Sequence, residues 1–161
     1  MVSMTNTLSR LPGRRRSAGM ALGLVLLAHL LAMPALATEQ GMIAADAARA
    51  LAQQGRITIV DIRRPDEWRQ TGLPEGARRA TVLPGRGAGR FLARIAELTN
   101  GDKSKPIALI CAAGVRSRHA SGLLRARGYT NVLEIREGML GNRHGAGWLK
   151  RSLPLVTCGR C

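Results

Sequence analysis

The chain has 161 residues and a formal net charge of +15, from 25 basic and 10 acidic side chains. This balance suggests an anionic partner, but two Trp, one Tyr and one Phe are too few aromatic residues for a surface that stacks nucleobases. The basic residues beyond residue 37 are scattered along the chain rather than gathered in one element. We therefore expect no nucleic-acid partner, and a length of this order suits one compact domain.

The first 37 residues are typical of a secretory signal peptide. Arginines at residues 10–16 form a basic segment, and residues 17–37 carry no charged side chain and end in an Ala-Leu-Ala sequence that suits cleavage after Ala37. The alternative is an uncleaved membrane anchor, because the uncharged stretch is long enough to span a bilayer. We expect cleavage, hence a periplasmic or secreted protein that contacts a membrane only if the segment is retained.

Residues 38–157 are expected to fold as one domain of alternating helices and strands. The first half contains three helical patterns, at residues 44–53, 65–68 and 91–98, the second of which opens with proline followed by acids. Two short apolar runs are typical of strands, at residues 57–60 and 80–83.

The second half continues the alternation. An apolar strand at residues 107–110 is followed by a helix at 117–127, a strand at 131–135 and a last helical or loop segment at 138–154. This order predicts an α/β fold, with a small parallel sheet flanked by helices on both faces. Such folds bind ligands beyond the carboxyl ends of their strands.

A short loop joins the strand at 107–110 to the helix that follows it. The loop consists of Cys111, Ala112, Ala113, Gly114, Val115, Arg116 and Ser117. Its backbone N–H groups and the dipole of the following helix favour an anion, so they would stabilise a thiolate on Cys111. The alternative is a small core residue, which a cysteine at a strand end often is. We expect a nucleophile, because Gly114 permits a tight loop and Arg116 adds a cation.

This loop resembles the active-site loop of the rhodanese family of sulfurtransferases. Four residues separate Cys111 from Arg116, whereas cysteine phosphatases have one more, and Ser117 stands where the phosphatase arginine would be. The resemblance therefore favours sulfur over phosphate, with a phosphatase or arsenate reductase as the rival class.

Other motifs extend the resemblance over most of residues 43–154. They are Asp61-Ile62-Arg63 with Glu67-Trp68, the turn at residues 72–77, Tyr129-x-x-Val132 and Glu137-Gly138-Met139. One departure is Leu73, which stands where the family usually has histidine.

The resemblance implies a role for each site residue. Cys111 would take sulfur from a donor such as thiosulfate as a persulfide and pass it to a thiol, a protein acceptor or cyanide. Arg116 would hold the loop and its anion, with Ser117 supporting it. Asp61 and Arg63 are expected to be architectural, with Arg63 pairing with an acid such as Glu67. No metal or organic cofactor is expected. The rival binding function is a carrier of sulfane sulfur, or an anion-binding module, that does not turn over.

A Cys-x-x-Cys tail, residues 158–161, ends the chain. Cys158 and Cys161 can close on each other, which would leave Cys111 free for chemistry. The pair is either a sulfur relay for Cys111 or an inert disulfide on a terminal segment, and we expect the inert form.

Overall fold

The computed structural model describes residues 41–83, 85, 87–159 and 161. The predicted signal peptide, residues 1–37, lies outside the described residues, so its cleavage stays a prediction. No helix in the described part of the chain has the length and apolar character needed to cross a membrane.

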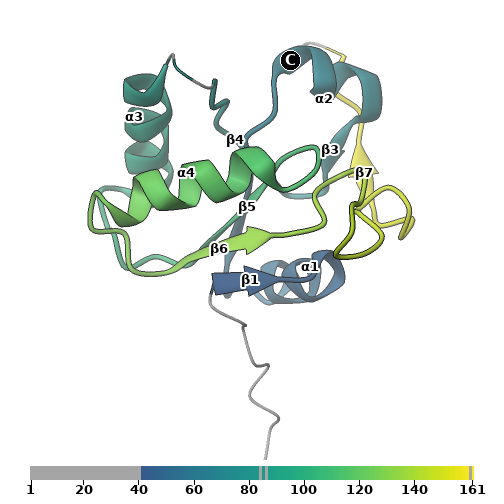
Figure 1. Ribbon diagram of the computed structural model, residues 1–161, viewed down its shortest axis with the longest axis horizontal. Helices are drawn as coiled ribbons and strands as arrows, with labels where there is room; N and C mark the ends of the chain where they lie inside the picture. The colour runs from purple at the N-terminus through teal and green to yellow at the C-terminus, as the bar shows by residue number, and fades with distance from the viewer. Residues whose placement is uncertain (1–40, 84, 86, 160) are drawn as a thin grey trace, which may run out of the picture. The chain divides into compact units, whose positions relative to one another are not determined.

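The described residues form a parallel sheet of five strands in the order β1-β6-β5-β2-β4 (Figure 1). These strands are β1 (Met42–Ile43), β2 (Thr58–Asp61), β4 (Arg78–Arg79), β5 (Ile107–Ile110) and β6 (Val132–Ile135). The central strand β5 pairs with β2 in the register Thr58↔Ile107 to Asp61↔Ile110. β5 is buried at every position, because helices cover both faces of the sheet.

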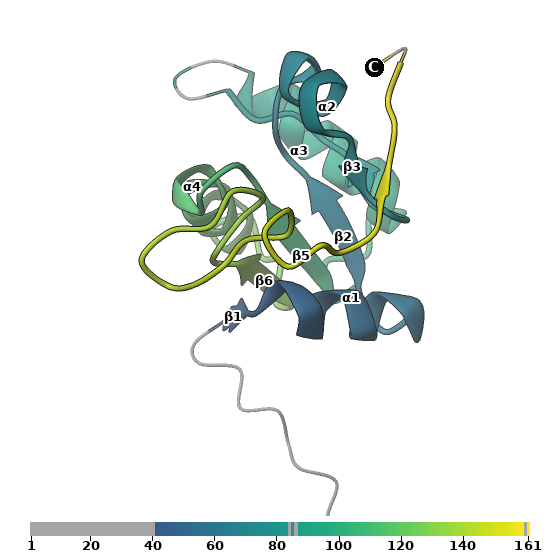
Figure 2. The ribbon, with the colours of Figure 1, turned by 90° about the vertical axis from the view of Figure 1, so that its right-hand side faces the viewer.

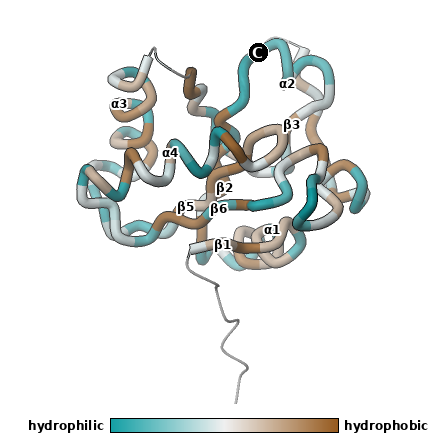
Figure 3. The backbone as a smooth tube through the Cα atoms, viewed as in Figure 1, coloured by the Kyte–Doolittle hydropathy of each residue, from teal (hydrophilic) through white to brown (hydrophobic). Residues whose placement is uncertain are grey.

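Four helices surround this sheet: α1 (Ala45–Gln53), α2 (Pro65–Thr71), α3 (Ala88–Thr99) and α4 (Val115–Arg125). Alternate residues of β5 face opposite sides, so Leu109 packs in one core with α3 and α4, and Ile110 in a second core with α1. Figure 2 shows α1 apart from α3 and α4. Figure 3 shows apolar residues along the central strands, whereas α2 is largely hydrophilic. The predicted α/β fold with helices on both faces is confirmed.

A second, two-stranded sheet ties the end of the chain to the segment after α2. Its antiparallel strands are β3 (Leu73–Pro74) and β7 (Leu155–Val156). The loop between β6 and β7 brings Trp148 into the α1 core, where it is fully buried and donates from Nε1 to the Pro154 carbonyl oxygen at 3.0 Å. The sequence analysis did not predict these short strands.

The strand predicted at residues 80–83 is wrong in position, because the regular strand in this region is β4, Arg78–Arg79. Ala80 and Val82 are buried, and their amides still donate to the backbone oxygens of Asp61 and Ile62 at 3.1 and 3.2 Å. The apolar pattern at residues 80–83 therefore arises from burial and not from a regular strand. This segment runs beside the residues at the end of β2, with two backbone hydrogen bonds to them.

Candidate active site

Cys111 lies directly after β5, at the carboxyl end of the central strand. The residue is 1 % exposed, whereas the loop residues 112–114 above it are half-buried. Helix α4 begins at Val115, two residues earlier than predicted, so the helix N-terminus comes closer to the sulfur. The thiol thus sits at the floor of a short loop.

Two polar groups of the loop surround the sulfur. The Gly114 amide donates to Cys111 Sγ at 3.2 Å, and Ser117 Oγ lies 3.6 Å from the same sulfur. Ser117 also donates to the Gly114 carbonyl oxygen at 2.9 Å. Because a hydroxyl has one hydrogen, Ser117 can serve one of these acceptors at a time. When the thiol ionises, that hydrogen can turn from the carbonyl to the sulfur.

A second loop, after β6, holds the first in shape. Met139 and Leu140 donate their amides to the carbonyl oxygens of Cys111 and Ala112, each at 2.9 Å. Asn142 Nδ2 donates to the Ala113 carbonyl oxygen at 3.0 Å. Three successive loop carbonyls are therefore bound to this second loop, which fixes the backbone beside the Gly114 amide that donates to the sulfur. No local sequence pattern marks Asn142, so its role was not predicted.

Arg116 is held by a carboxylate from α2. Its Nη1 and Nη2 donate to Glu67 Oε2 and Oε1 at 2.7 and 2.5 Å, a bidentate pair. The side-chain hydrogen bond from Arg116 is the largest cause that lowers the pKa of Glu67, and the same bond raises the pKa of Arg116. The guanidinium thus fixes the end of the loop to α2, with its charge paired with that of Glu67.

The buried Asp61–Arg63 pair lies at the carboxyl end of β2. Arg63 Nη2 donates to Asp61 Oδ2 at 2.6 Å, with the two side chains 2 % and 0 % exposed. Arg63 also donates to Gly72 O at 2.7 Å and to Thr71 Oγ1 at 2.7 Å. Arg63 pairs with an acid, as predicted, but this acid is Asp61 rather than Glu67, because the Glu67 carboxylate binds Arg116. These contacts tie β2 to the end of α2.

The Glu67–Arg116 pair makes stability depend on acid pH. Since the pKa of Glu67 is lowered in the fold from an ordinary 4.5, its contribution is full above that value and is lost as the pH falls through the folded pKa. We expect Glu67→Gln to cost about 1–2 kcal/mol at pH 7, and this cost to shrink toward pH 3. Urea unfolding of both proteins from pH 7 to pH 3 measures it.

A matched control is Glu97→Gln, which removes the exposed pair between Glu97 and Arg94. Its curve should run close to that of the wild type at every pH, because exposed ion pairs contribute little. A gap between Glu67→Gln and the wild type that stays constant down to pH 3 would contradict the role assigned to the pair.

The Cys158–Cys161 disulfide forms as predicted, and Cys111 is a free cysteine. Arg79 Nη1 lies 3.2 Å from Cys161 Sγ, and Arg69 Nη1 donates to the Cys161 carbonyl oxygen at 2.7 Å. The disulfide is thus held by residues of α2 and β4. In the part of the chain that the structure describes, no hydrogen bond joins it to the loop at 111–117.

The described residues contain no group of three or more His, Cys, Asp or Glu side chains that could hold a metal ion.

Three comparisons place the loop in context. An uncharacterised protein of Rickettsia prowazekii is 29 % identical over 98 residues, covering 60 % of this chain and 80 % of its own length. A sulfurtransferase of Allochromatium vinosum is 28 % identical over 107 residues, covering 66 % of this chain and 85 % of its own. The polysulfide-sulfur transferase homodimer of Wolinella succinogenes has a similar structure, with a TM-score of 0.56, 25 % identity and coverage of 74 % and 80 %.

The family model described as a rhodanese-like domain matches residues 44–142. The match contains β2, the Asp61–Arg63 pair, β5, the Cys111 loop and the first part of the loop after β6, through Asn142. Since the match covers more than half of the chain, this protein belongs to the rhodanese-like domain family.

Proposed function

We propose that the protein is an exported, single-domain sulfurtransferase that carries sulfane sulfur as a persulfide on Cys111. The observation that carries the proposal is the position of Cys111 Sγ inside a short loop, with the Gly114 amide at 3.2 Å and Arg116 closing the loop. An anionic sulfur placed there is stabilised by the Gly114 amide and by the N-terminus of α4, without a separate base.

The reaction has two displacement steps. In the first, the Cys111 thiolate attacks the outer sulfur of a donor such as thiosulfate, the donor S–S bond breaks, and sulfite leaves with the electron pair. In the second, a thiolate or cyanide attacks the outer sulfur of the persulfide, and the Cys111 thiolate leaves. No net electrons are gained or lost by the protein over the cycle.

A carrier without turnover is the second candidate, and the burial of Cys111 at 1 % exposure favours it. A sulfur held at the floor of the loop is shielded from a bulky acceptor. The two functions share the first step and differ in the second.

The test is mass spectrometry of the purified protein after exposure to thiosulfate, followed by a cyanide chase. We expect wild type to gain the mass of one sulfur atom and to lose it in the chase, while Cys111→Ala gains none. An adduct that persists through the chase would assign the carrier function. If wild type, like Cys111→Ala, gains no sulfur adduct, both the sulfurtransferase and the carrier proposals are wrong.

The terminal cysteines are expected to be inert in this cycle. The double variant Cys158→Ser, Cys161→Ser should keep the wild-type turnover with thiosulfate and cyanide, and with a protein thiol as acceptor, since the disulfide is held on α2 and β4. Steady-state assays with both acceptors measure this. A loss confined to the protein acceptor would assign the pair a relay role.

A further inference from the structure

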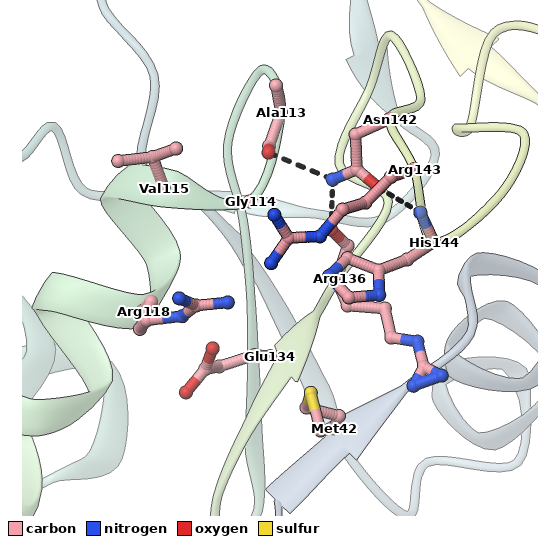
Figure 4. Close-up of a pocket in the computed structure, with 10 residues that line it drawn as sticks. All are labelled: Met42, Ala113, Gly114, Val115, Arg118, Glu134, Arg136, Asn142, Arg143 and His144. Carbon is pink, nitrogen blue, oxygen red and sulfur yellow. Dashed lines mark hydrogen bonds between the residues drawn. The ribbon is translucent and has the colours of Figure 1, made fainter.

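A cavity of about 450 Å³ lies beside the Cys111 loop, between α4, β6 and the loop that follows β6 (Figure 4). Its lining includes Gly114 and Val115 from the start of α4, and Asn142 and Arg143 from the loop after β6. This volume is in the range of small-molecule sites, and it is much larger than the volume of a small inorganic oxyanion. The space therefore suits an organic ligand of modest size.

The lining of the cavity is positively charged by count, with three arginines and one acid, Glu134. In Figure 4 the guanidinium groups of Arg118, from α4, and Arg143, from the loop after β6, point into the space between these two elements. Within the described residues, no hydrogen bond or ion pair engages either guanidinium. Glu134 is the acid at this cavity, and its Oε1 is held by Ser121 Oγ, which donates to it, and by Arg125 Nη1 at 3.4 Å.

The cavity is connected to the sulfur through one residue. Gly114 lines the cavity, and its amide donates to Cys111 Sγ at 3.2 Å. Val115, 78 % exposed, gives the same rim an apolar side chain. A ligand anchored on Arg118 and Arg143 would thus lie next to Gly114, and its thiol would have to extend past this residue to reach the outer sulfur of the persulfide.

We propose that this cavity binds the sulfur acceptor, and that the acceptor is a small thiol bearing at least two carboxylate or phosphate groups. Guanidinium groups bind such oxyanions through paired hydrogen bonds, and two of them favour a dianion over a neutral or cationic thiol. The inference rests on the proposed sulfur transfer. Its step is the second displacement above: the acceptor thiolate attacks the outer sulfur, the persulfide S–S bond breaks, and the Cys111 thiolate leaves.

The experiment compares two acceptors, 2-mercaptosuccinate with two carboxylates and neutral 2-mercaptoethanol, with thiosulfate as donor. In Arg118→Gln, Arg143→Gln we expect the KM for mercaptosuccinate to rise about tenfold, equivalent to about 1.4 kcal/mol, with kcat unchanged. The KM for mercaptoethanol should not change. Added salt should raise only the mercaptosuccinate KM of wild type, because it screens exposed charges.

Two further variants serve as controls. Arg118→Lys, Arg143→Lys keeps the charge and should recover most of the selectivity. Arg56→Gln, Arg127→Gln makes the same change of net charge at the opposite end of the fold, before β2 and after α4, and should behave as wild type. Equal KM changes for both thiols, or the same change in the control pair, would overturn the proposal.

A binding measurement separates this inference from the proposed function. Calorimetric titration with 2-(methylthio)succinate, which cannot accept sulfur, reports the anion site without turnover. Binding by wild type that the double glutamine variant loses supports the site even if no sulfur is transferred. If wild type transfers sulfur but neither binds 2-(methylthio)succinate nor distinguishes the two thiols, the acceptor site is wrong. The proposed sulfurtransferase function would be unaffected by that result.

Discussion

Replacing Asp61 by alanine is expected to destabilise the fold by about 3–5 kcal/mol, a large part of the stability of a typical domain. The change leaves the Arg63 guanidinium, 2 % exposed, without its carboxylate in the interior. Arg63 also joins the end of β2 to Gly72, so its displacement would loosen the junction between α2 and β3. Urea unfolding monitored by tryptophan fluorescence measures the loss.

The matched control is Asp66→Ala. Asp66 forms an ion pair of similar length with Arg64, 2.8 Å, but both side chains are more than half exposed. We expect the free energy of unfolding to change little, since water replaces the lost partner. Similar losses in the two variants would show that burial is not what makes the Asp61–Arg63 pair important.

Replacing Gly138 by alanine is expected to lower both stability and sulfur transfer. Gly138 has φ +65°, and an added Cβ would lie 2.6 Å from Ala112 O and 2.7 Å from Cys111 O. The second loop would have to move away from the first, so the bonds that hold the Cys111 and Ala112 carbonyls would stretch. We expect a cost of about 2–4 kcal/mol and a drop in the thiosulfate–cyanide rate of at least about tenfold.

Gly76→Ala isolates the steric part of this effect. Gly76 has φ +74°, but nothing lies within 4 Å of an added Cβ. It should show the backbone cost alone, about 1–2 kcal/mol, with an unchanged rate per folded molecule. If Gly138→Ala lowers the free energy of unfolding and the transfer rate no more than Gly76→Ala does, the close approach of the two loops does not matter for stability or activity.

Local sequence patterns predict the helices and strands whose buried residues recur regularly along the chain. β5 reads as an apolar run because both faces of the sheet are covered there, and α3 shows helical spacing because it has one buried face. β1, β3 and β7 have two residues each, and their partners are distant in sequence, so no local pattern marks them. The strand predicted at residues 80–83 was misplaced because Ala80 and Val82 are buried without belonging to a regular strand.

The site divides in the same way. The loop from Cys111 to Arg116 was predictable because its residues are consecutive. The pairing of Arg116 with Glu67 was not, because the two acids near Arg63 are equivalent in sequence, and only the fold assigns Asp61 to one arginine and Glu67 to the other. The Asn142 bond to Ala113 depends likewise on two loops meeting.

The packing of Trp148 sets a practical limit on how this protein can be shortened. The family match ends at residue 142, but Trp148 is among the largest fully buried side chains, and Pro154 and β7 complete its surroundings. A recombinant fragment cut at the family boundary would leave a void against α1 and an unpaired edge at β3. Expression of the isolated domain should therefore extend through Val156 to give a soluble product.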